Sequence, residues 1–222
     1  MGFEREPRTV TDAVILMAGI GSRLGTPSGA IAKPLVRIGG RPLICYTLDA
    51  LQSVGVRTVH TVMGATSERL SEELEPLIPA GLRLNVIVNH EWQKQNGVSV
   101  LCADGKATAP FFLVMGDHLF EAAILATLLA EGDRGQVNLA VDRKITSIFD
   151  YLRRAQRNGD CSLSDGIRLM AADQKVRAVD IGEEWWQDVD TPEMLARAEQ
   201  ESARLLRDGG GRLAQERVAG ER

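Results

Sequence analysis

Short apolar runs alternate with amphipathic stretches along most of the 222 residues of this chain. The apolar runs are β-branched or aromatic and are bounded by Gly, Asn or Asp, which is typical of strands buried on both faces. Five strands are predicted in this way, at residues 13–17, 58–63, 84–88, 111–115 and 137–141. Helical patterns lie between them, at residues 42–54, 67–77, 121–130 and 145–157. The alternation predicts an α/β fold with a mostly parallel central sheet and helices on both faces.

The carboxyl-terminal part of the chain predicts one more helix and then a tail. Pro192 suits the start of this helix, which is expected to run from Glu193 to about Arg207. Three consecutive glycines and a polar sequence follow, which indicate a flexible end or a linker stump at residues 208–222. We therefore expect one domain at residues 12–207.

The composition of the chain argues against several classes of function. The net charge of −4 gives no general basic surface for nucleic acid, so a polyphosphate ligand would have to be bound by local cations. Cys45, Cys102 and Cys161 follow no metal-binding or redox spacing, which indicates free thiols in a reducing compartment. No apolar run approaches the length that spans a membrane, and the amino terminus lacks the apolar stretch of a signal peptide. The expectation is a cytoplasmic protein that neither inserts into a membrane nor binds nucleic acid.

A glycine-rich segment follows the first predicted strand, at the place where parallel α/β sheets bind ligands. Residues 17–25 read Met-Ala-Gly-Ile-Gly-Ser-Arg-Leu-Gly. The dinucleotide fingerprint does not fit, because the third glycine falls one residue late, and the P-loop does not fit, because Gly-Lys-Ser/Thr is absent. Backbone N–H groups of such a loop can nevertheless close around phosphate oxygens.

The loop and two segments that follow it together resemble the signature of sugar-phosphate nucleotidyltransferases of the NTP-transferase, MobA-like kind. The two segments are Lys-Pro-Leu-Val from Lys33 and Gly-Gly-Arg-Pro-Leu-Ile from Gly39. Two departures are Met17, where the signature usually has alanine, and the spacer before Lys33, which is longer than in many relatives. The resemblance covers roughly Asp12 to Ala198 and is strongest to CTP:inositol-1-phosphate cytidylyltransferases. It implies a Rossmann-like three-layer fold, Mg²⁺ as cofactor, and CTP or another nucleoside triphosphate as substrate.

The resemblance also implies roles for particular residues. Arg23 would neutralise the β- and γ-phosphates as they become pyrophosphate, and Lys33 would stabilise charge around the α-phosphate. The alternative is a glycine turn with two surface cations. A further Asn-Gly-Val-Ser element starts at Asn96 and opens a short helical stretch; in relatives with a similar element this region meets the base and sugar, although Asn-Gly alone is a turn signal. The implied nucleotide-binding residues are Met17, Ala18, Gly19, Gly21, Ser22, Arg23, Asn96, Gly97, Ser99 and Gly116.

Three aspartates are candidates for the metal. Asp117 comes just after the strand at 111–115, where it would hold Mg²⁺ against the α-phosphate; the alternative is an N-cap of the next helix. Asp188 and Asp190 belong to a segment that resembles the Asp-x-Asp-Thr-Pro-Glu element of cytidylyltransferases. They would point the same way in an extended segment, so the sequence does not choose between them. Asp190-Thr-Pro also suits an N-cap followed by proline at the first helical position.

The acceptor half of the resemblance is less complete. It implies transfer to inositol 1-phosphate, with phosphocholine, aminoalkylphosphonates and other cyclitol or sugar phosphates as open alternatives. Asp142, Arg143 and Lys144 are candidates for the acceptor phosphate, and a charged surface is the alternative. In the family, some tens of residues follow the position of Arg143, whereas here Lys144-Ile-Thr joins the next helix directly. This difference is either a true deletion or a segment missing from the sequence.

Two further expectations concern activity and partners. A protein that binds nucleotide but has lost transferase activity with the missing segment is the rival to an enzyme. If the family function holds, a downstream membrane CDP-alcohol transferase consumes the product. A homodimer through a sheet edge is compatible with the predicted fold.

Overall fold

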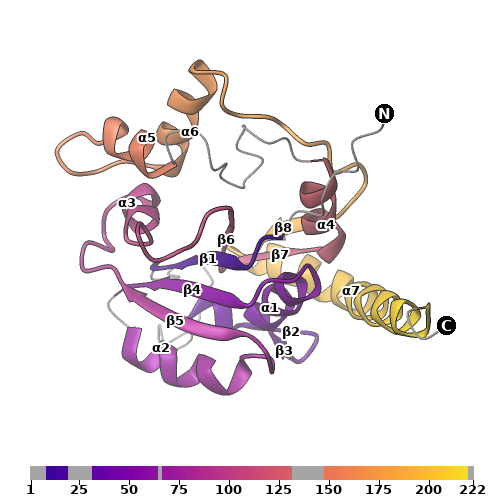
Figure 1. Cartoon of the computed structure of the whole chain (residues 1–222). Helices are drawn as coiled ribbons and strands as arrows, with labels where there is room; N and C mark the ends of the chain where they lie inside the picture. The colour runs from indigo at the N-terminus through magenta and orange to yellow at the C-terminus, as the bar shows by residue number, and fades with distance from the viewer. Residues whose placement is uncertain (1–8, 20–31, 65–66, 132–147, 220–222) are drawn as a thin grey trace, which may run out of the picture.

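The computed structural model describes residues 9–19, 32–64, 67–131 and 148–219, and for residues 131 and 206–219 it describes the backbone alone. A four-stranded parallel sheet with the order β5-β4-β1-β6 forms its centre (Figure 1). The strands are β1 (Asp12–Met17), β4 (Thr58–Met63), β5 (Arg83–Val88) and β6 (Phe111–Met115). The prediction of an α/β fold with a parallel central sheet is confirmed. The strand expected at 137–141 lies outside the described residues.

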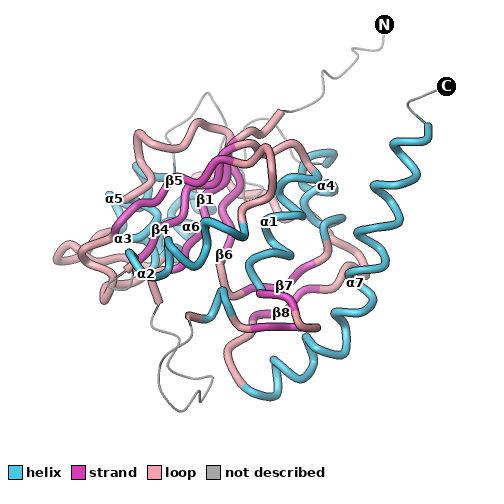
Figure 2. Tube along the Cα trace, turned by 90° about the horizontal axis from the view of Figure 1, so that it is seen from below, coloured by secondary structure: helices cyan, strands magenta, loops and turns pink. Residues whose placement is uncertain are grey.

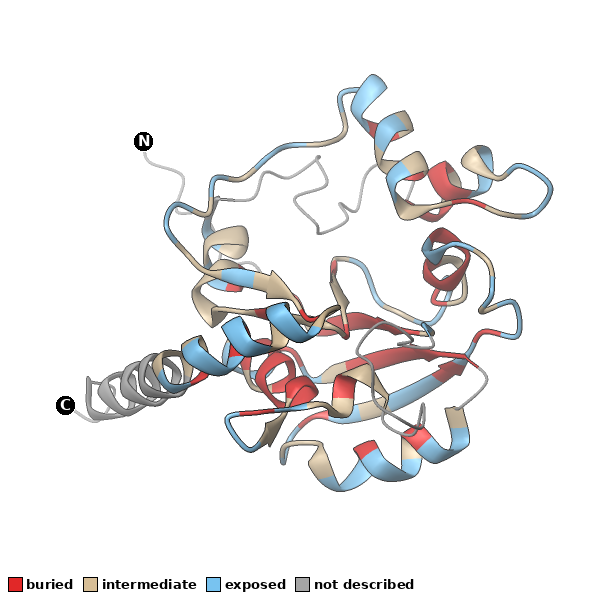
Figure 3. Ribbon diagram, turned by 180° about the vertical axis from the view of Figure 1, so that it is seen from behind, coloured by how far each residue is buried: buried red, intermediate tan, exposed pale blue. Residues whose placement is uncertain are grey.

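Helices cover both faces of this sheet, as the three-layer prediction requires (Figure 1). On one face, Ala13, Ile15 and Met17 of β1 pack with α1 (Leu43–Ser53), α2 (Ser67–Leu74) and α4 (Ala122–Glu131). On the other, Val14 and Leu16 pack with α3 (Asn96–Leu101), α5 (Ile148–Ala155) and α6 (Leu163–Ala172). Successive residues of β1 point to opposite faces, and all of them are buried, because β1 lies between β4 and β6 (Figure 3).

Smaller elements lie outside the central sheet. The 3-10 turn η2 (Lys33–Leu35) precedes the hairpin of β2 (Arg37–Ile38) and β3 (Arg41–Pro42), and η3 (Glu75–Leu77) extends α2. A second two-stranded sheet joins segments far apart in sequence, since β7 (His118–Phe120) pairs antiparallel with β8 (Trp186–Asp188). Figure 2 shows this β7–β8 pair beside α1 and α7 (Pro192–Ala219). Their shared apolar cluster consists of Ile38, Leu43, Tyr46, Leu119, Val189 and Ala198.

Three differences from the sequence predictions have physical reasons. Helix α6 was not expected; it begins with a capping box, in which Ser162 and Asp165 satisfy each other's backbone N–H groups. Helix α7 continues to Ala219, whereas the glycines led us to expect its end near Arg207 and a flexible tail at 208–222. Helix-favouring residues such as Leu213, Ala214 and Gln215 follow the three glycines. The domain boundary at 207 itself stays a prediction.

The third difference concerns β5, which is not buried on both faces. Among the described strands, β5 pairs with β4 alone and so forms an edge of the sheet. Val86 and Val88 are consequently 36% and 42% exposed. Apolar runs in sequence therefore predicted the strand but not its position at the edge.

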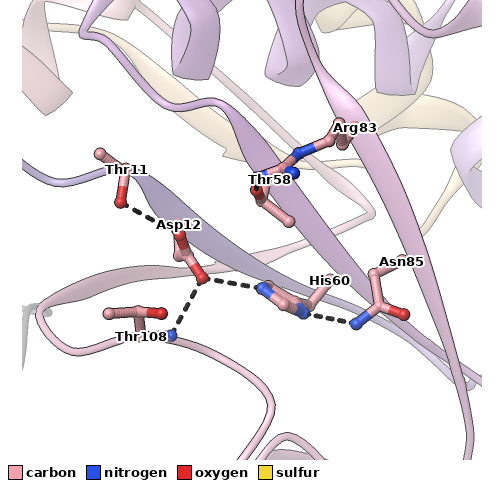
Figure 4. Close-up of polar contacts among 7 residues, drawn as sticks. All are labelled: Thr11, Asp12, Thr58, His60, Arg83, Asn85 and Thr108. Atoms are coloured by element: carbon pink, nitrogen blue, oxygen red, sulfur yellow. Dashed lines mark hydrogen bonds and ion pairs between the residues drawn. The ribbon is translucent and has the colours of Figure 1, made fainter.

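A polar network centred on the buried residues Asp12 and His60 connects the three strands β1, β4 and β5 (Figure 4). Asp12 Oδ2 lies 2.9 Å from His60 Nε2 and also accepts a hydrogen bond of 2.9 Å from the Thr108 backbone N–H. The Asn85 amide nitrogen donates to His60 Nδ1 over 2.8 Å, which leaves the ring proton on Nε2, donated to Asp12. Burial acts to raise the pKa of Asp12, but the hydrogen bonds from Thr108, His60 and Thr11 hold it below its ordinary value.

Candidate functional site

Lys33 is the first residue of η2, and proline at the second position favours such a turn. The turn is closed by a hydrogen bond of 2.8 Å from the Leu35 N–H to the Ala32 carbonyl. The Leu43 N–H donates to the Val36 carbonyl over 2.8 Å, which ties the segment after η2 to the start of α1. The side chain of Lys33 is 15% exposed. The backbone around Lys33 is thus fixed, and its ammonium group is largely shielded from water.

Asp117 follows β6, at the carboxyl end of the central sheet. The Gly116 N–H donates to the Leu16 carbonyl over 2.9 Å, so β6 stays beside β1 up to this point. A Cβ atom at Gly116 would lie 2.4 Å from Met17 Cγ, so only glycine fits here without movement of Met17. The next element is strand β7, so the alternative of Asp117 as a helix N-cap is wrong. Its carbonyl accepts a hydrogen bond of 2.8 Å from the Val189 N–H, which brings the late aspartates to the same place.

Asp190 lies between β8 and α7. The Met194 N–H lies 3.3 Å from Thr191 Oγ1 and donates to it, and Pro192 is the first helical residue. Thr191, rather than Asp190, therefore acts as the N-cap, and proline occupies the position where its missing N–H costs nothing. Asp188 lies within β8, directly opposite His118 of β7.

These elements bring Lys33, Asp117 and Asp190 together. Lys33 Nζ lies 3.3 Å from Asp117 Oδ2 and also forms an ion pair with Asp190 Oδ1. The two carboxylates are 24% and 18% exposed, so water screens these charges only partly. Asp117 Oδ1 is buried and accepts no hydrogen bond from the described residues, and His118 Nε2 lies 3.8 Å from it. One ammonium group thus faces two carboxylates at the carboxyl end of the sheet.

This arrangement suits a divalent cation. An unsatisfied buried carboxylate oxygen is costly, and a hard cation bound to Asp117 and Asp190 would satisfy it. Within the described ranges, no group of three or more His, Cys, Asp and Glu residues is placed to hold a metal. Mg²⁺ in nucleotide sites is typically held by one or two carboxylates together with substrate phosphates. Two aspartates at this position meet that pattern.

The glycine loop is described only at its start. Met17 ends β1 and is buried, and Gly19 is exposed, with open space where a Cβ would lie. A Cβ at Gly64, which follows β4, would approach the Ala18 carbonyl to 2.8 Å and Trp92 Cβ to 2.9 Å. Gly64 was not among the site residues predicted from the sequence. Six of the expected site residues lie outside the described part of the chain: Gly21, Ser22, Arg23, Asp142, Arg143 and Lys144.

The residues of the Asn96 element make hydrogen bonds and packing contacts within the fold, and these contacts explain most of the residue types found there. Asn96 Oδ1 accepts a hydrogen bond of 2.8 Å from the Leu163 N–H at the start of α6. A Cβ at Gly97 would lie 2.5 Å from the Cys161 carbonyl oxygen, so glycine allows α3 to pack against that segment. Ser99 Oγ accepts a hydrogen bond of 3.0 Å from the buried Asn89 amide. These contacts join α3 to α6 and to the end of β5, and nucleotide contact by this element stays a prediction.

The aromatic rings of His118 and Trp186 lie together next to the carboxylates, a feature that was not predicted from the sequence. Trp186 lies two residues before Asp188 on β8, and its ring is tilted by 49° against that of His118, with 5.7 Å between centroids. Trp186 is 54% exposed, although large aromatic side chains are usually covered. The signal was present as two consecutive tryptophans just before the late aspartates. The position of Trp186 beside the carboxylates depends on the β7–β8 pairing, which sequence periodicity does not reveal.

Comparison with known proteins identifies related sequences and folds. The MobA-like NTP transferase domain matches residues 13–179. CMP-5'-(3-aminopropyl)phosphonate synthase of Streptomyces rubellomurinus is 36% identical over 148 residues, which are 66% of this chain and 23% of that protein. The bifunctional IPC transferase and DIPP synthase of Thermococcus kodakarensis is 29% identical over 237 residues, covering 90% of this chain and 52% of that protein. The chain thus spans about half the length of these curated relatives or less.

Solved structures share the fold. The inositol-1-phosphate CTP transferase from T. maritima superposes with a TM-score of 0.69 at 18% identity, covering 87% of this chain and 98% of that one. UDP-glucose pyrophosphorylase in complex with UDP-glucose also gives a TM-score of 0.69, at 14% identity, and 88% of this chain is covered with 99% of that one. At these identities the likeness concerns the fold alone, and it supports the Rossmann-like nucleotidyltransferase architecture. In the described part of the chain, no helix is both long and apolar enough to span a membrane.

Proposed function

Because this chain belongs to the MobA-like NTP transferase domain family, we propose that it transfers a cytidylyl group from CTP to a small phosphorylated acceptor and releases pyrophosphate. The observation that carries this proposal is Lys33 facing Asp117 and Asp190 at the carboxyl end of the central sheet. Phosphoryl-type transfer needs positioned cations and metal-binding carboxylates rather than a protein nucleophile. The site supplies both kinds of group within one ion-paired cluster.

Asp117 and Asp190 would hold Mg²⁺ in this reaction. The cation would neutralise phosphate charge and help to orient the α-phosphate for attack. The buried Asp117 Oδ1, which has no hydrogen-bond partner among the described residues, supports this assignment. So does the ion pairing of both carboxylates with the single Lys33 ammonium group. Asp190 is preferred over Asp188, because Asp190 reaches Lys33, whereas Asp188 stands opposite His118 in the β7–β8 pair.

Lys33 and Arg23 would act on the triphosphate. With Mg²⁺ held by the two aspartates, the Lys33 ammonium would be able to turn to a phosphate oxygen and stabilise negative charge at the α-phosphate. Arg23 would bind the leaving pyrophosphate in a bidentate manner. Gly19 leaves open space beside the end of β1, where backbone N–H groups can approach phosphate. An acceptor phosphate oxygen would then attack the α-phosphorus in line, and the Asn96 element would contact the cytidine.

Inositol 1-phosphate is the proposed acceptor. The names of the Thermococcus relative and of the T. maritima structure, an IPC transferase and an inositol-1-phosphate CTP transferase, support this choice. An aminoalkylphosphonate is the second candidate, supported by the 36% identity to the Streptomyces synthase. The Thermococcus alignment spans 237 positions, more than the 222 residues of this chain, so that relative has residues that this chain lacks. The two candidate acceptors are compared directly in the assay below.

The proposal has consequences for partners. A CDP-alcohol product is a substrate for a membrane CDP-alcohol transferase, which we propose as the downstream enzyme. We also propose that the step takes place in the cytoplasm.

Two experiments test the reaction itself. Pyrophosphate release should be measured with CTP, UTP and GTP against a panel of inositol 1-phosphate, phosphocholine and 3-aminopropylphosphonate, and mass spectrometry should identify the product. Release with none of the combinations, despite nucleotide binding, would favour a protein that has lost transferase activity.

A further inference from the structure

One edge of the central sheet presents unpaired main-chain groups. β5 pairs with β4 on one side, and no strand in the described ranges pairs with it on the other. The Arg83 N–H donates to the Arg57 carbonyl over 2.9 Å and the Asn89 N–H to the Met63 carbonyl over 2.8 Å. In a parallel ladder every second residue bonds to the same neighbour, so the odd-numbered residues 83–89 face β4. The N–H and C=O groups that point away from β4 belong to Leu84, Val86 and Val88.

The side chains of these three residues share one face and form an apolar row. Val86 and Val88 are two of the three large hydrophobic side chains that are exposed in the described part of the chain. Natural edge strands usually carry an outward charge, a proline or a bulge, which prevents pairing with another chain. β5 reads Arg-Leu-Asn-Val-Ile-Val, with none of these between residues 84 and 88, and its register with β4 is continuous. The edge is therefore competent to accept another strand.

We propose that β5 pairs antiparallel with β5 of a second copy of this chain, around a two-fold axis at Val86. In this register Val86 faces Val86 of the second copy, and Leu84 faces Val88. Each of these residues directs both its N–H and its C=O outwards, so three facing pairs exchange two hydrogen bonds each. The same pairs place aliphatic side chains opposite one another on one face of the sheet, where cross-strand contacts between such residues are favourable. The two sheets then form one continuous sheet.

A second copy fits this edge because the strand is complementary to itself. In the proposed register, Arg83 faces the neutral Asn89 of the second copy, and no two like charges stand opposite each other. A two-fold contact uses the same surface on both copies, so pairing through β5 occupies the β5 edge of each copy and closes this contact at a dimer. The edge also lies away from the carboxylate cluster, since β4 separates β5 from β1 and β6. Each copy would keep its own Lys33, Asp117 and Asp190.

Cysteine cross-linking tests both the surface and the register. Facing residues of this type have Cα atoms about 5.5 Å apart, within the range for a disulfide. Val86→Cys, made with Cys102→Ala to remove the partly exposed native thiol, should therefore give a covalent dimer under mild oxidation. Val88→Cys in the same background is the matched control. Its two copies would be roughly 14 Å apart along the strands, too far for a bond.

Association without a cross-link is measured by analytical ultracentrifugation over a range of concentrations. The unaltered chain should show a dimer that dissociates on dilution. Val86→Lys, which sets two charges opposite each other, should raise the dissociation constant by about tenfold or more. Ala171→Lys on the exposed surface of α6 should leave it unchanged, and circular dichroism checks that both variants fold. A chain that is monomeric throughout, with no Val86→Cys cross-link, would overturn the proposal. So would equal cross-linking of Val86→Cys and Val88→Cys, or a dimer that Val86→Lys leaves unaffected.

Discussion

Lys33 and Asp190 form an ion pair although 157 positions separate them in the chain. A contact between the β2–β3 turn and α7 helps to keep the two residues together. The Gly39 N–H, in the turn of the β2–β3 hairpin that follows Lys33, donates to Glu199 Oε2 of α7 over 2.6 Å. Asp190 directly precedes α7. One helix therefore positions both sides of the cluster, and Asp117 completes it from the end of β6.

The two late aspartates give a matched pair of substitutions. Asp190→Asn should lower kcat/KM for pyrophosphate release by a factor of roughly 10² or more, because it removes a charge that holds the metal. Asp188→Asn, in the same segment but opposite His118, should change it much less. The required measurement is the Mg²⁺ dependence of turnover in both variants. A larger loss in Asp188→Asn than in Asp190→Asn would reverse the proposed assignment.

Substitution of the two cations tests the phosphate-binding role. Lys33→Ala and Arg23→Ala should each cost roughly 2–4 kcal/mol in kcat/KM, the scale for loss of one group that stabilises charge in the transition state. Lys33→Arg keeps the charge and should recover part of the activity. Thermal unfolding serves as the control, since loss of Lys33 also leaves two carboxylates facing each other. If both alanine variants release pyrophosphate at the unaltered rate, the glycine loop is a plain turn.

Trp186 offers a test of the acceptor side. Its exposed ring lies against His118 beside the carboxylates, where an aromatic face can pack on a cyclitol ring or an alkylammonium group. Trp186→Ala should raise the KM for the acceptor severalfold and leave the KM for CTP unchanged, while Trp186→Phe should retain most of the affinity. Steady-state kinetics with each substrate varied in turn provide the measurement. An increase confined to the KM for CTP would place the ring on the nucleotide side instead.

The central fold could be predicted from the sequence because buried strands require apolar residues. The runs at 58–63 and 111–115 coincide with β4 and β6, since strands covered on both faces need uninterrupted apolar residues. The same reasoning failed for β5, where an apolar run forms an exposed edge. Helix α6 was missed although Ser162 and Asp165 form a capping box, a signal that was available. The long α7 was missed because glycine propensity argued for a stop that the structure does not make.

Site residues could be predicted where a single segment contains a recognisable motif. They could not be predicted where their role depends on contacts between segments far apart in sequence. Lys33 was identified by resemblance to the nucleotidyltransferase signature and Asp117 by its place after a strand, and the structure brings them within 3.3 Å. Our preference for Asp190 over Asp188 rests on two long-range contacts that sequence periodicity does not reveal. Asp190 pairs with Lys33, 157 positions away, and Asp188 stands opposite His118 in the β7–β8 pairing. Gly97 and Gly116 were read as nucleotide contacts, but close packing against other segments already requires glycine at both positions.

The buried Asp12–His60 pair should give the fold an acid-sensitive component (Figure 4). The pKa of Asp12 is lowered in the folded chain, so its stabilising effect is present above the unfolded pKa of about 3.9 and is lost as pH falls through the folded value. Asp12→Asn should destabilise the fold at pH 7 by about 1–3 kcal/mol and weaken the loss of stability below pH 4. Urea unfolding at several pH values measures both effects. Equal pH dependence in the variant and the unaltered chain would contradict this role.

The most direct test of the account is pyrophosphate release from CTP, Mg²⁺ and inositol 1-phosphate by the unaltered chain and by Asp117→Asn. The variant is nearly isosteric and lacks the charge that would hold the metal. The account predicts release by the unaltered chain that requires Mg²⁺ and the acceptor, and release near background in Asp117→Asn, with the same thermal unfolding temperature for both. Turnover by Asp117→Asn close to that of the unaltered chain would contradict the metal-assisted transfer proposed for this cluster.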